Sequence, residues 1–166
     1  GKMIAETSCV DFYAYDMNVY LAEYGCSLFY HSGKVANVLS ATNIQGLQAS
    51  MPPNGHIAIL ISHTGENERL IEIAKMLRKN KTKVIILAGR RNSTIIPYAD
   101  EFIYAAGKKK VEEFWNSMFF ASGKYILDIL YEMEFSRKYE ENLKLNLKYE
   151  QSGEKRLWGL VDDTIV

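Results

Sequence analysis

Short apolar runs alternate with stretches of helical periodicity along this 166-residue chain, and this alternation limits its fold more than any other feature. The run at residues 56–61 is almost entirely apolar, which is typical of a central strand in a parallel sheet covered on both faces. A helix is predicted over residues 66–80. Its apolar residues fall on one stripe, among them Leu70, Ile73 and Leu77. Strand–helix alternation with short loops indicates a parallel α/β sheet.

The remaining elements complete a doubly wound, five-stranded parallel sheet flanked by helices, for which we predict the strand order 2-1-3-4-5. The predicted strands cover residues 9–14, 34–39, 56–61, 84–88 and 101–104. The predicted helices cover residues 2–8, 17–31, 41–50, 66–80, 94–99, 110–134 and 137–156. In this order the chain reverses direction between strands 1 and 3, and ligands bind outside the carboxyl ends of the strands at such a point. The loops at residues 14–18 and 62–67 are therefore expected to face one cleft.

Length and composition describe one ordinary globular domain, residues 1–166. Twenty Lys and Arg balance twenty Asp and Glu, and this neutrality argues against DNA binding by these residues alone. No apolar run approaches the roughly 20 residues of a membrane span, and no signal peptide is visible, so we expect a cytoplasmic protein. Cys9 and Cys26 fit neither a disulfide framework nor a zinc spacing. We expect reduced thiols, no metal and no cofactor.

The loop Ser62-His63-Thr64-Gly65-Glu66-Asn67 is the most informative stretch of the chain. It joins a strand that we expect to be buried to a strongly amphipathic helix. Hydroxyl groups, a glycine and unpaired backbone N–H groups at a helix start form a good anion site, because the helix dipole adds about half a positive charge there. Gly65 lets the backbone approach a ligand closely. The same residue types also serve as ordinary helix caps, so spacing alone leaves both interpretations open.

Several segments then resemble a known family. Residues 61–67 resemble the Ser-x-Ser-Gly-Glu-Thr signature of sugar isomerase (SIS) domains, and residues 83–89 look like the strand that follows it. Residues 93–100 look like the family's Ser-Pro-Leu-Ala…Ala-Asp segment. Residues 125–131 are similar to an Asp-containing helix of RpiR-type transcription regulators, which join an N-terminal helix-turn-helix domain to a SIS domain that senses a phosphosugar. The resemblance covers roughly residues 9–135.

This resemblance implies a phosphosugar site near Ser62, Thr64 and Asn67, where the family uses hydroxyl residues to hold the phosphate. Thr64 keeps the hydroxyl, and Asn67 would donate through its amide instead. His63 occupies the variable position of the signature; it could add a donor, but we expect an exposed bystander. The predicted ligand-binding residues are Asn18, Ser62, His63, Thr64, Gly65, Glu66 and Asn67.

The first loop departs from the family pattern, because residues 14–18 read Ala-Tyr-Asp-Met-Asn where Gly-x-Gly-x-Ser is usual. Asn18 could replace the contact of the missing serine. Asp16 is unfavourable, since a carboxylate about 5 Å from a phosphate costs roughly 3 kcal/mol per unit charge at an effective dielectric near 20. Either Asp16 turns away as a helix cap, which we expect, or the ligand is not a standard phosphosugar. The second case includes an empty, degenerate site.

The helix predicted over residues 110–134 carries an apolar stripe wide enough for two packing surfaces, and we expect one of them to be a partner subunit in a homodimer. Its early part includes Val111, Phe114 and Trp115. Ser93 is expected to cap the short helix at residues 94–99.

The resemblance implies a non-catalytic effector domain, cut from a longer regulator that contacts DNA only through an N-terminal domain absent from this chain. One alternative is an aldose–ketose isomerase, which needs a base; Glu66, Glu112 and Glu113 are candidates, together with the three histidines. Another alternative is a dimerisation module with a degenerate sugar site. Arg90 and Arg91 follow the fourth predicted strand at the cleft end of the sheet and could attract an anionic ligand.

Overall fold

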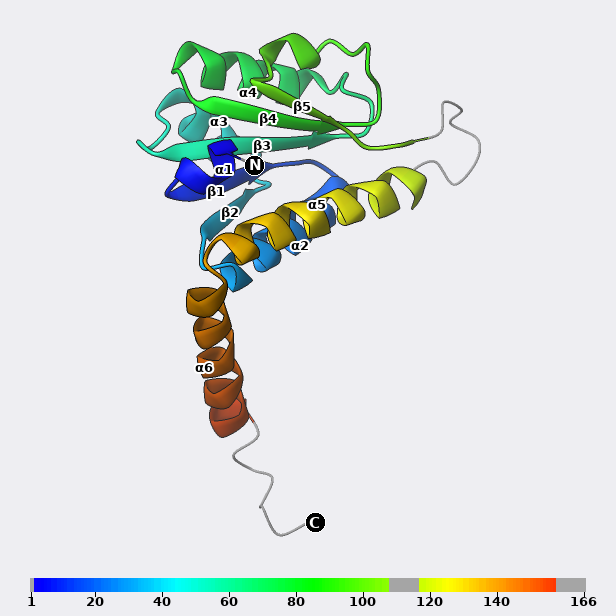
Figure 1. The fold of residues 1–166 in the computed structure, drawn as a ribbon. Helices are drawn as coiled ribbons and strands as arrows, with labels where there is room; N and C mark the ends of the chain where they lie inside the picture. The colour runs from blue at the N-terminus through cyan, green and yellow to red at the C-terminus, as the bar shows by residue number, and fades with distance from the viewer. Residues whose placement is uncertain (1, 108–116, 158–166) are drawn as a thin grey trace.

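The computed structural model describes residues 2–107 and 117–157, and its five strands form one sheet in which every neighbouring pair is parallel (Figure 1). The strand order is β2-β1-β3-β4-β5, which confirms the predicted fold class. The strands are β1 (Cys9–Tyr13), β2 (Val35–Leu39), β3 (His56–Ser62), β4 (Lys83–Ala88) and β5 (Glu101–Tyr104).

The helices follow the predicted pattern, with shifts of one or two residues at most ends. They are α1 (Lys2–Glu6), α2 (Asn18–His31), α3 (Thr42–Ser50), α4 (Glu68–Lys79), α5 (Ser117–Arg137) and α6 (Tyr139–Leu157), with a 3₁₀ turn, η1, at Ile96–Tyr98. The prediction for residues 110–116 lies outside the described residues, and so do Val111, Phe114 and Trp115.

One predicted cap is wrong. Ser93 does not cap a helix over residues 94–99, because the turn there begins at Ile96 and the side chain at its N-cap position, Ile95, makes no hydrogen bond. The Ser93 hydroxyl donates instead to the carbonyl of Arg90, at 3.3 Å. None of the helices in the described ranges is long and apolar enough to cross a membrane.

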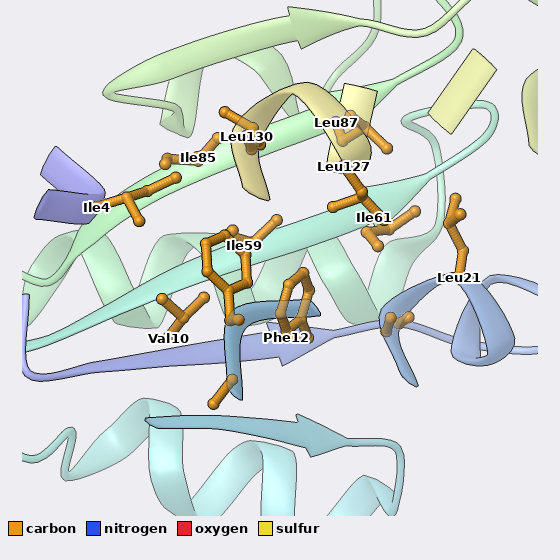
Figure 2. Close-up of a cluster of buried hydrophobic side chains, with 14 of the residues drawn as sticks. Ile4, Val10, Phe12, Leu21, Ile59, Ile61, Ile85, Leu87, Leu127 and Leu130 are labelled. Atoms are coloured by element: carbon orange, nitrogen blue, oxygen red, sulfur yellow. The ribbon is translucent and has the colours of Figure 1, made fainter. Parts of the chain in front are cut away.

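Side chains alternate between two packed layers. Val10, Phe12 and Ile59 belong to the core beneath α2 and α5, which Figure 2 shows with side chains from both strands and helices pointing into one cluster. Tyr13 and Leu60 belong to the core beneath α3 and α4, on the opposite face. Each central strand is therefore buried on both sides, which explains why residues 56–61 are so apolar.

Strand β1 lies between β2 and β3, with Cys9 beside His56 and Tyr13 beside Leu60 in register. Because the strands are parallel, the carboxyl ends of β1 and β3 meet at one edge of the sheet and their amino ends meet at the other. The loops after these two strands lead into helices on opposite faces, α2 and α4 (Figure 1). This is the switch point at which α/β sheets bind ligands.

Helix α6 leaves the body of the domain and extends away from the sheet (Figure 1). Two amides near its start attach it: Asn142 Nδ2 donates to the carbonyl of Phe135 at 3.1 Å, and Asn146 Nδ2 donates to the carbonyl of His31 at 2.7 Å. The second bond satisfies a carbonyl at the C-terminal end of α2, which has no partner within its own helix.

Candidate functional site

The turn after β3 is fixed by Gly65. Its φ of +68° lies in the left-handed region, and its N–H donates to Ser62 Oγ at 3.0 Å. A Cβ atom at this position would lie 2.1 Å from Ser93 Oγ, so the loop packs directly against the segment that follows β4. Glycine is therefore required at this position by both backbone conformation and space.

Two further side chains of this loop hold backbone amides. Thr64 Oγ1 accepts from the N–H of Glu66 at 3.1 Å, and Asn67 Oδ1 accepts from the N–H of Leu70 at 3.1 Å as the N-cap of α4. The expectation of wholly unpaired amides is therefore wrong for Gly65 and Glu66. Within the described residues, the loop side chains accept from the N–H groups of Gly65, Glu66 and Leu70, and not from those of Glu68 and Arg69 at the start of α4.

The side chains that cap these amides keep donors of their own. Ser62 and Thr64 use only lone pairs in the bonds above, so each hydroxyl hydrogen is available, and Asn67 uses only its carbonyl oxygen, so Nδ2 is available. The loop thus offers an anion two hydroxyls, one amide and the positive end of a 12-residue helix.

These donors face a hollow of about 160 Å³ between the loops that follow β1 and β3. It is lined by five of the predicted residues, namely Asn18, Ser62, His63, Thr64 and Asn67, together with Tyr15, Asp16, Met17, Ile61 and Leu70. Gly65 and Glu66, the other two predicted residues, do not line it.

Asn18, the first residue of α2, has a side-chain oxygen without a hydrogen-bond donor among the described residues. Its Oδ1 is buried and has no hydrogen-bond partner in the described part of the chain. Buried polar side-chain atoms nearly always have a partner, so this oxygen requires a donor from a ligand or from water.

The predicted cap role of Asp16 is wrong. The N-cap of α2 is Met17, and no side chain caps this helix. Asp16 has a left-handed backbone with a φ of +53°, and its exposed side chain lines the hollow. Asp16 also lines an adjoining cavity of about 290 Å³. The guanidinium-bearing Arg69 lines this second cavity too, so a cationic and an anionic residue border the same space.

Glu66 is turned toward the loop after β4. Its carboxylate accepts hydrogen bonds from the N–H of Thr94 at 2.9 Å and from Thr94 Oγ1 at 2.5 Å. These bonds lower the pKa of Glu66 below its ordinary value of 4.5. The carboxylate therefore joins two loops and is a weak base that points away from the hollow.

His63 is half-buried, so the expectation of an exposed side chain is wrong. Its ring lies 4.9 Å from that of Phe119. Burial, together with the charge of Arg90, lowers the pKa of His63 below 6.5, so the ring is neutral at physiological pH. A neutral imidazole can donate one hydrogen bond to a ligand without adding charge.

A larger cavity of about 590 Å³ adjoins the hollow through His63. Arg90 and Arg91 line it, as the sequence suggested for an anion-attracting site, and the Arg91 guanidinium lies 4.2 Å from the centre of the Tyr104 ring. Sequence analysis missed Tyr104, the last residue of β5. The predicted strand order alone would have found it, because it places the end of β5 beside the end of β4.

The other candidate bases do not reach the hollow or lie outside the described residues. His31 contacts Asn146 on α6, and His56 lies at the amino end of β3. Glu112 and Glu113 fall in the stretch that the structure does not describe.

Comparison of the chain with known protein families identifies the class of protein to which it belongs. The chain matches the SIS domain family over residues 6–125 and belongs to that family. A search of the curated proteins finds no match.

Solved structures share the fold closely but little sequence. The Vibrio vulnificus NanR protein complexed with ManNAc-6P superposes with a TM-score of 0.80 at 14% identity, over 89% of this chain and 57% of that one. The RpiR transcription factor from Sphaerobacter thermophilus (sugar isomerase domain) gives 0.80 at 12% identity, over 90% of this chain and 82% of that one. The Methanococcus jannaschii protein MJ1247, with an inferred function as a 3-hexulose-6-phosphate isomerase, gives 0.68 at 18% identity, over 85% and 77%.

These identities establish the fold alone. The same fold is thus shared by two transcription regulators and by a protein with an inferred isomerase function. Since this chain spans little more than half of the NanR chain, any activity of such a whole regulator is a proposal for it.

Proposed function

We propose that this chain is the ligand-sensing domain of an RpiR-type transcription regulator, and that it binds a phosphorylated sugar at the carboxyl ends of β1 and β3. The observation that carries the proposal is the hollow between the two loops. There the hydroxyls of Ser62 and Thr64 and the amide of Asn67 all keep hydrogens to donate. Donors gathered at a helix start suit the oxygens of a phosphate dianion.

The sugar part of the ligand extends from the phosphate toward other polar groups of the site. Asn18 Oδ1 accepts one sugar hydroxyl, and the neutral ring of His63 donates to another. The cavity along Arg90 and Tyr104 gives the sugar room beyond the 160 Å³ of the hollow itself. Several weak polar contacts of this kind fix the orientation of a ligand more than its affinity.

In this proposal the domain works as a cytoplasmic homodimer, and DNA is bound only by a helix-turn-helix domain that precedes this chain. Helix α5 supports a dimer, because one side is buried on the core through Phe119, Leu127 and Leu130 while the other exposes Tyr125 and Ile129. Ligand binding would shift the subunit arrangement and hence DNA affinity, with a coupling of about 1–3 kcal/mol.

A phosphosugar isomerase is the second candidate, favoured by the likeness to an isomerase fold. Such an enzyme needs a base near the sugar C1 and C2 atoms. Glu66 is poorly suited, because Thr94 engages its carboxylate, which leaves His63, whose ring lines the hollow, together with Glu112 and Glu113. Turnover of sugar phosphates by the purified chain, abolished by His63→Gln, Glu66→Gln, Glu112→Gln or Glu113→Gln, would decide for the enzyme.

The test of the sensor is calorimetric titration of the purified chain with a panel of aldose and ketose 5- and 6-phosphates, each paired with the same sugar lacking phosphate. We expect one panel member to bind, its unphosphorylated partner to bind far more weakly, and no conversion of the bound sugar. Binding at a hundredfold excess over Kd also stabilises the fold by about 2.7 kcal/mol, which a thermal shift detects. A complete absence of binding and of thermal shifts would support the degenerate module instead.

A further inference from the structure

A second group of polar side chains lies at the opposite end of the same two strands. Cys9 and Asp11 of β1 alternate with Val10 and Phe12, so they share the face of the sheet that α3 and α4 cover. His56, the first residue of β3, is the register neighbour of Cys9. The three side chains therefore meet at the amino ends of the strands, remote from the hollow at the carboxyl ends.

Their potential ligand atoms converge closely. His56 Nδ1 lies 2.8 Å from Asp11 Oδ2, and Cys9 Sγ lies 3.7 Å from Asp11 Oδ1. The sulfur, nitrogen and carboxylate oxygen all lie within 4.8 Å of one another. No other group of three or more His, Cys, Asp and Glu side chains in residues 2–107 and 117–157 comes together in this way.

The surrounding amides point their hydrogens at these ligand atoms. Asn37 Nδ2 donates to Asp11 Oδ1 at 2.8 Å and to Cys9 Sγ at 3.3 Å. Gln48 Nε2, from α3, donates to Asp11 Oδ2 at 2.8 Å. Amide donors that hold the carboxylate and the sulfur in place are the kind of outer partners that orient metal ligands.

Charge is scarce around this cluster. Asp11 is only 3% exposed, and its one ion pair among the described residues is with His56. A buried carboxylate that no Lys or Arg side chain pairs with among the described residues favours a metal cation. The sulfur decides between cations, because Mg²⁺ and Ca²⁺ prefer oxygen ligands whereas zinc accepts sulfur, nitrogen and oxygen together.

We propose that Cys9, Asp11 and His56 form a zinc site that stabilises the amino end of the sheet. Zinc takes these atoms in a tetrahedron at about 2.0–2.3 Å, so the ion would replace the hydrogen bond between His56 Nδ1 and Asp11 Oδ2. Water supplies the fourth ligand, reaching the ion past His56, whose side chain is 18% exposed. On binding, the Cys9 sulfur gives its proton to solvent and coordinates as a thiolate, while His56 coordinates through the lone pair of Nδ1 with its proton on Nε2.

Sequence spacing alone does not reveal this site. The three ligands come from two strands separated by more than 40 residues, and only the parallel register of β1 and β3 brings them together. The second cysteine, Cys26, lies on α2 and donates to the carbonyl of Ala36 at 3.3 Å. It is not part of the cluster and serves as a matched control.

The test uses the full chain, stripped of metal by a chelator and titrated with zinc in competition with a fluorescent zinc indicator. We expect one zinc per chain with a Kd below micromolar. Substitution with Co²⁺ should give a thiolate-to-metal charge-transfer band that disappears in Cys9→Ser and persists in Cys26→Ser. His56 is partly exposed at a strand end, so His56→Gln is expected to fold and to weaken zinc binding at least tenfold.

Three outcomes would overturn the zinc site: no uptake tighter than micromolar, a charge-transfer band that survives Cys9→Ser, or zinc affinity unchanged in His56→Gln. Circular dichroism of each variant without metal separates loss of ligand from loss of fold. Phosphosugar binding is measured separately on the same samples, so failure of the zinc site and failure of the proposed function remain distinguishable.

Discussion

The two ends of strands β1 and β3 differ in how their polar atoms are used. At the carboxyl end, Ser62, Thr64 and Asn67 keep donors that face a hollow, and Asn18 keeps an acceptor without a partner. At the amino end, Asp11 is buried and accepts hydrogen bonds from the side chains of Asn37, Gln48 and His56. The carboxyl end has donors that face a hollow, whereas the amino end has acceptors that neighbouring side chains already engage.

If both proposals hold, one parallel pair of strands binds opposite charges at its two ends. In the proposed site, donors at the start of α4 would attract an anion, and the dipole of this helix would add to their effect. Acceptors at the amino end attract a cation, because sulfur, nitrogen and carboxylate lone pairs converge there. We therefore expect the carboxyl end to determine ligand affinity and the amino end to determine stability.

The largest expected effect is on stability, in Asp11→Ala measured with chelator present. This change leaves the donors of Asn37, Gln48 and His56 without their buried acceptor, and we expect unfolding to be easier by about 3–5 kcal/mol. Urea denaturation measures the loss. If the protein loses less than about 1 kcal/mol, the amino end is not the stabilising end and the comparison fails.

Gly65→Ala comes next, because it tests whether the shape of the loop depends on this residue. A Cβ atom here would clash with Ser93, and the left-handed backbone is itself strained for alanine, so we expect a loss of about 2–3 kcal/mol together with loss of ligand binding. Gly46→Ala is the matched control. No atom lies within 4 Å of a Cβ there, and in a helix alanine is favoured by about 1 kcal/mol.

Ser62→Ala and Thr64→Ala test the donors directly. Each removes one hydroxyl, and we expect about a tenfold weaker phosphosugar affinity, equal to about 1.4 kcal/mol, in calorimetric titration. Ser62→Ala also leaves the buried N–H of Gly65 without its hydrogen-bond acceptor. We therefore expect the Ser62→Ala protein to be less stable than the Thr64→Ala protein. Ser50→Ala, at the exposed end of α3, should change neither quantity. Unchanged affinity in both loop variants would contradict the assignment of the anion site.

The smallest expected effect is an increase in phosphosugar affinity. Asp16→Asn removes the carboxylate that lines the hollow, and asparagine tolerates the same left-handed backbone. Because Asp16 is exposed, solvent screens its charge, and we expect phosphosugar affinity to rise only about threefold at low salt and less at high salt. Calorimetry at two salt concentrations measures it. An affinity that falls in this variant would mean that Asp16 contacts the ligand favourably.

Most of the fold could be predicted from the sequence, because its signals are local. The apolar run at residues 56–61 and the stripe on α4 each encode burial through their own periodicity. Loop contacts could not be predicted in the same way. The left-handed backbone at Asp16 and the attachment of Glu66 to Thr94 depend on segments that meet only in the fold.

The two polar sites differ in the same respect. The loop at residues 62–67 is contiguous, so its hydrogen-bonding residues can be recognised in six consecutive positions of the sequence. The cluster of Cys9, Asp11 and His56 is spread over two strands and depends on their register. A search of the sequence for closely spaced cysteine and histidine ligands does not find this cluster.

The most direct test of the central claim is a titration of the isotope-labelled chain with the phosphosugar that binds in calorimetry, followed by amide chemical shifts. The account predicts the largest changes at Thr64, Asn67, Glu68 and Arg69, with smaller ones at Asn18 and none at Cys9 or His56. Shifts confined to other parts of the chain, or an absence of shifts at the start of α4, would contradict it.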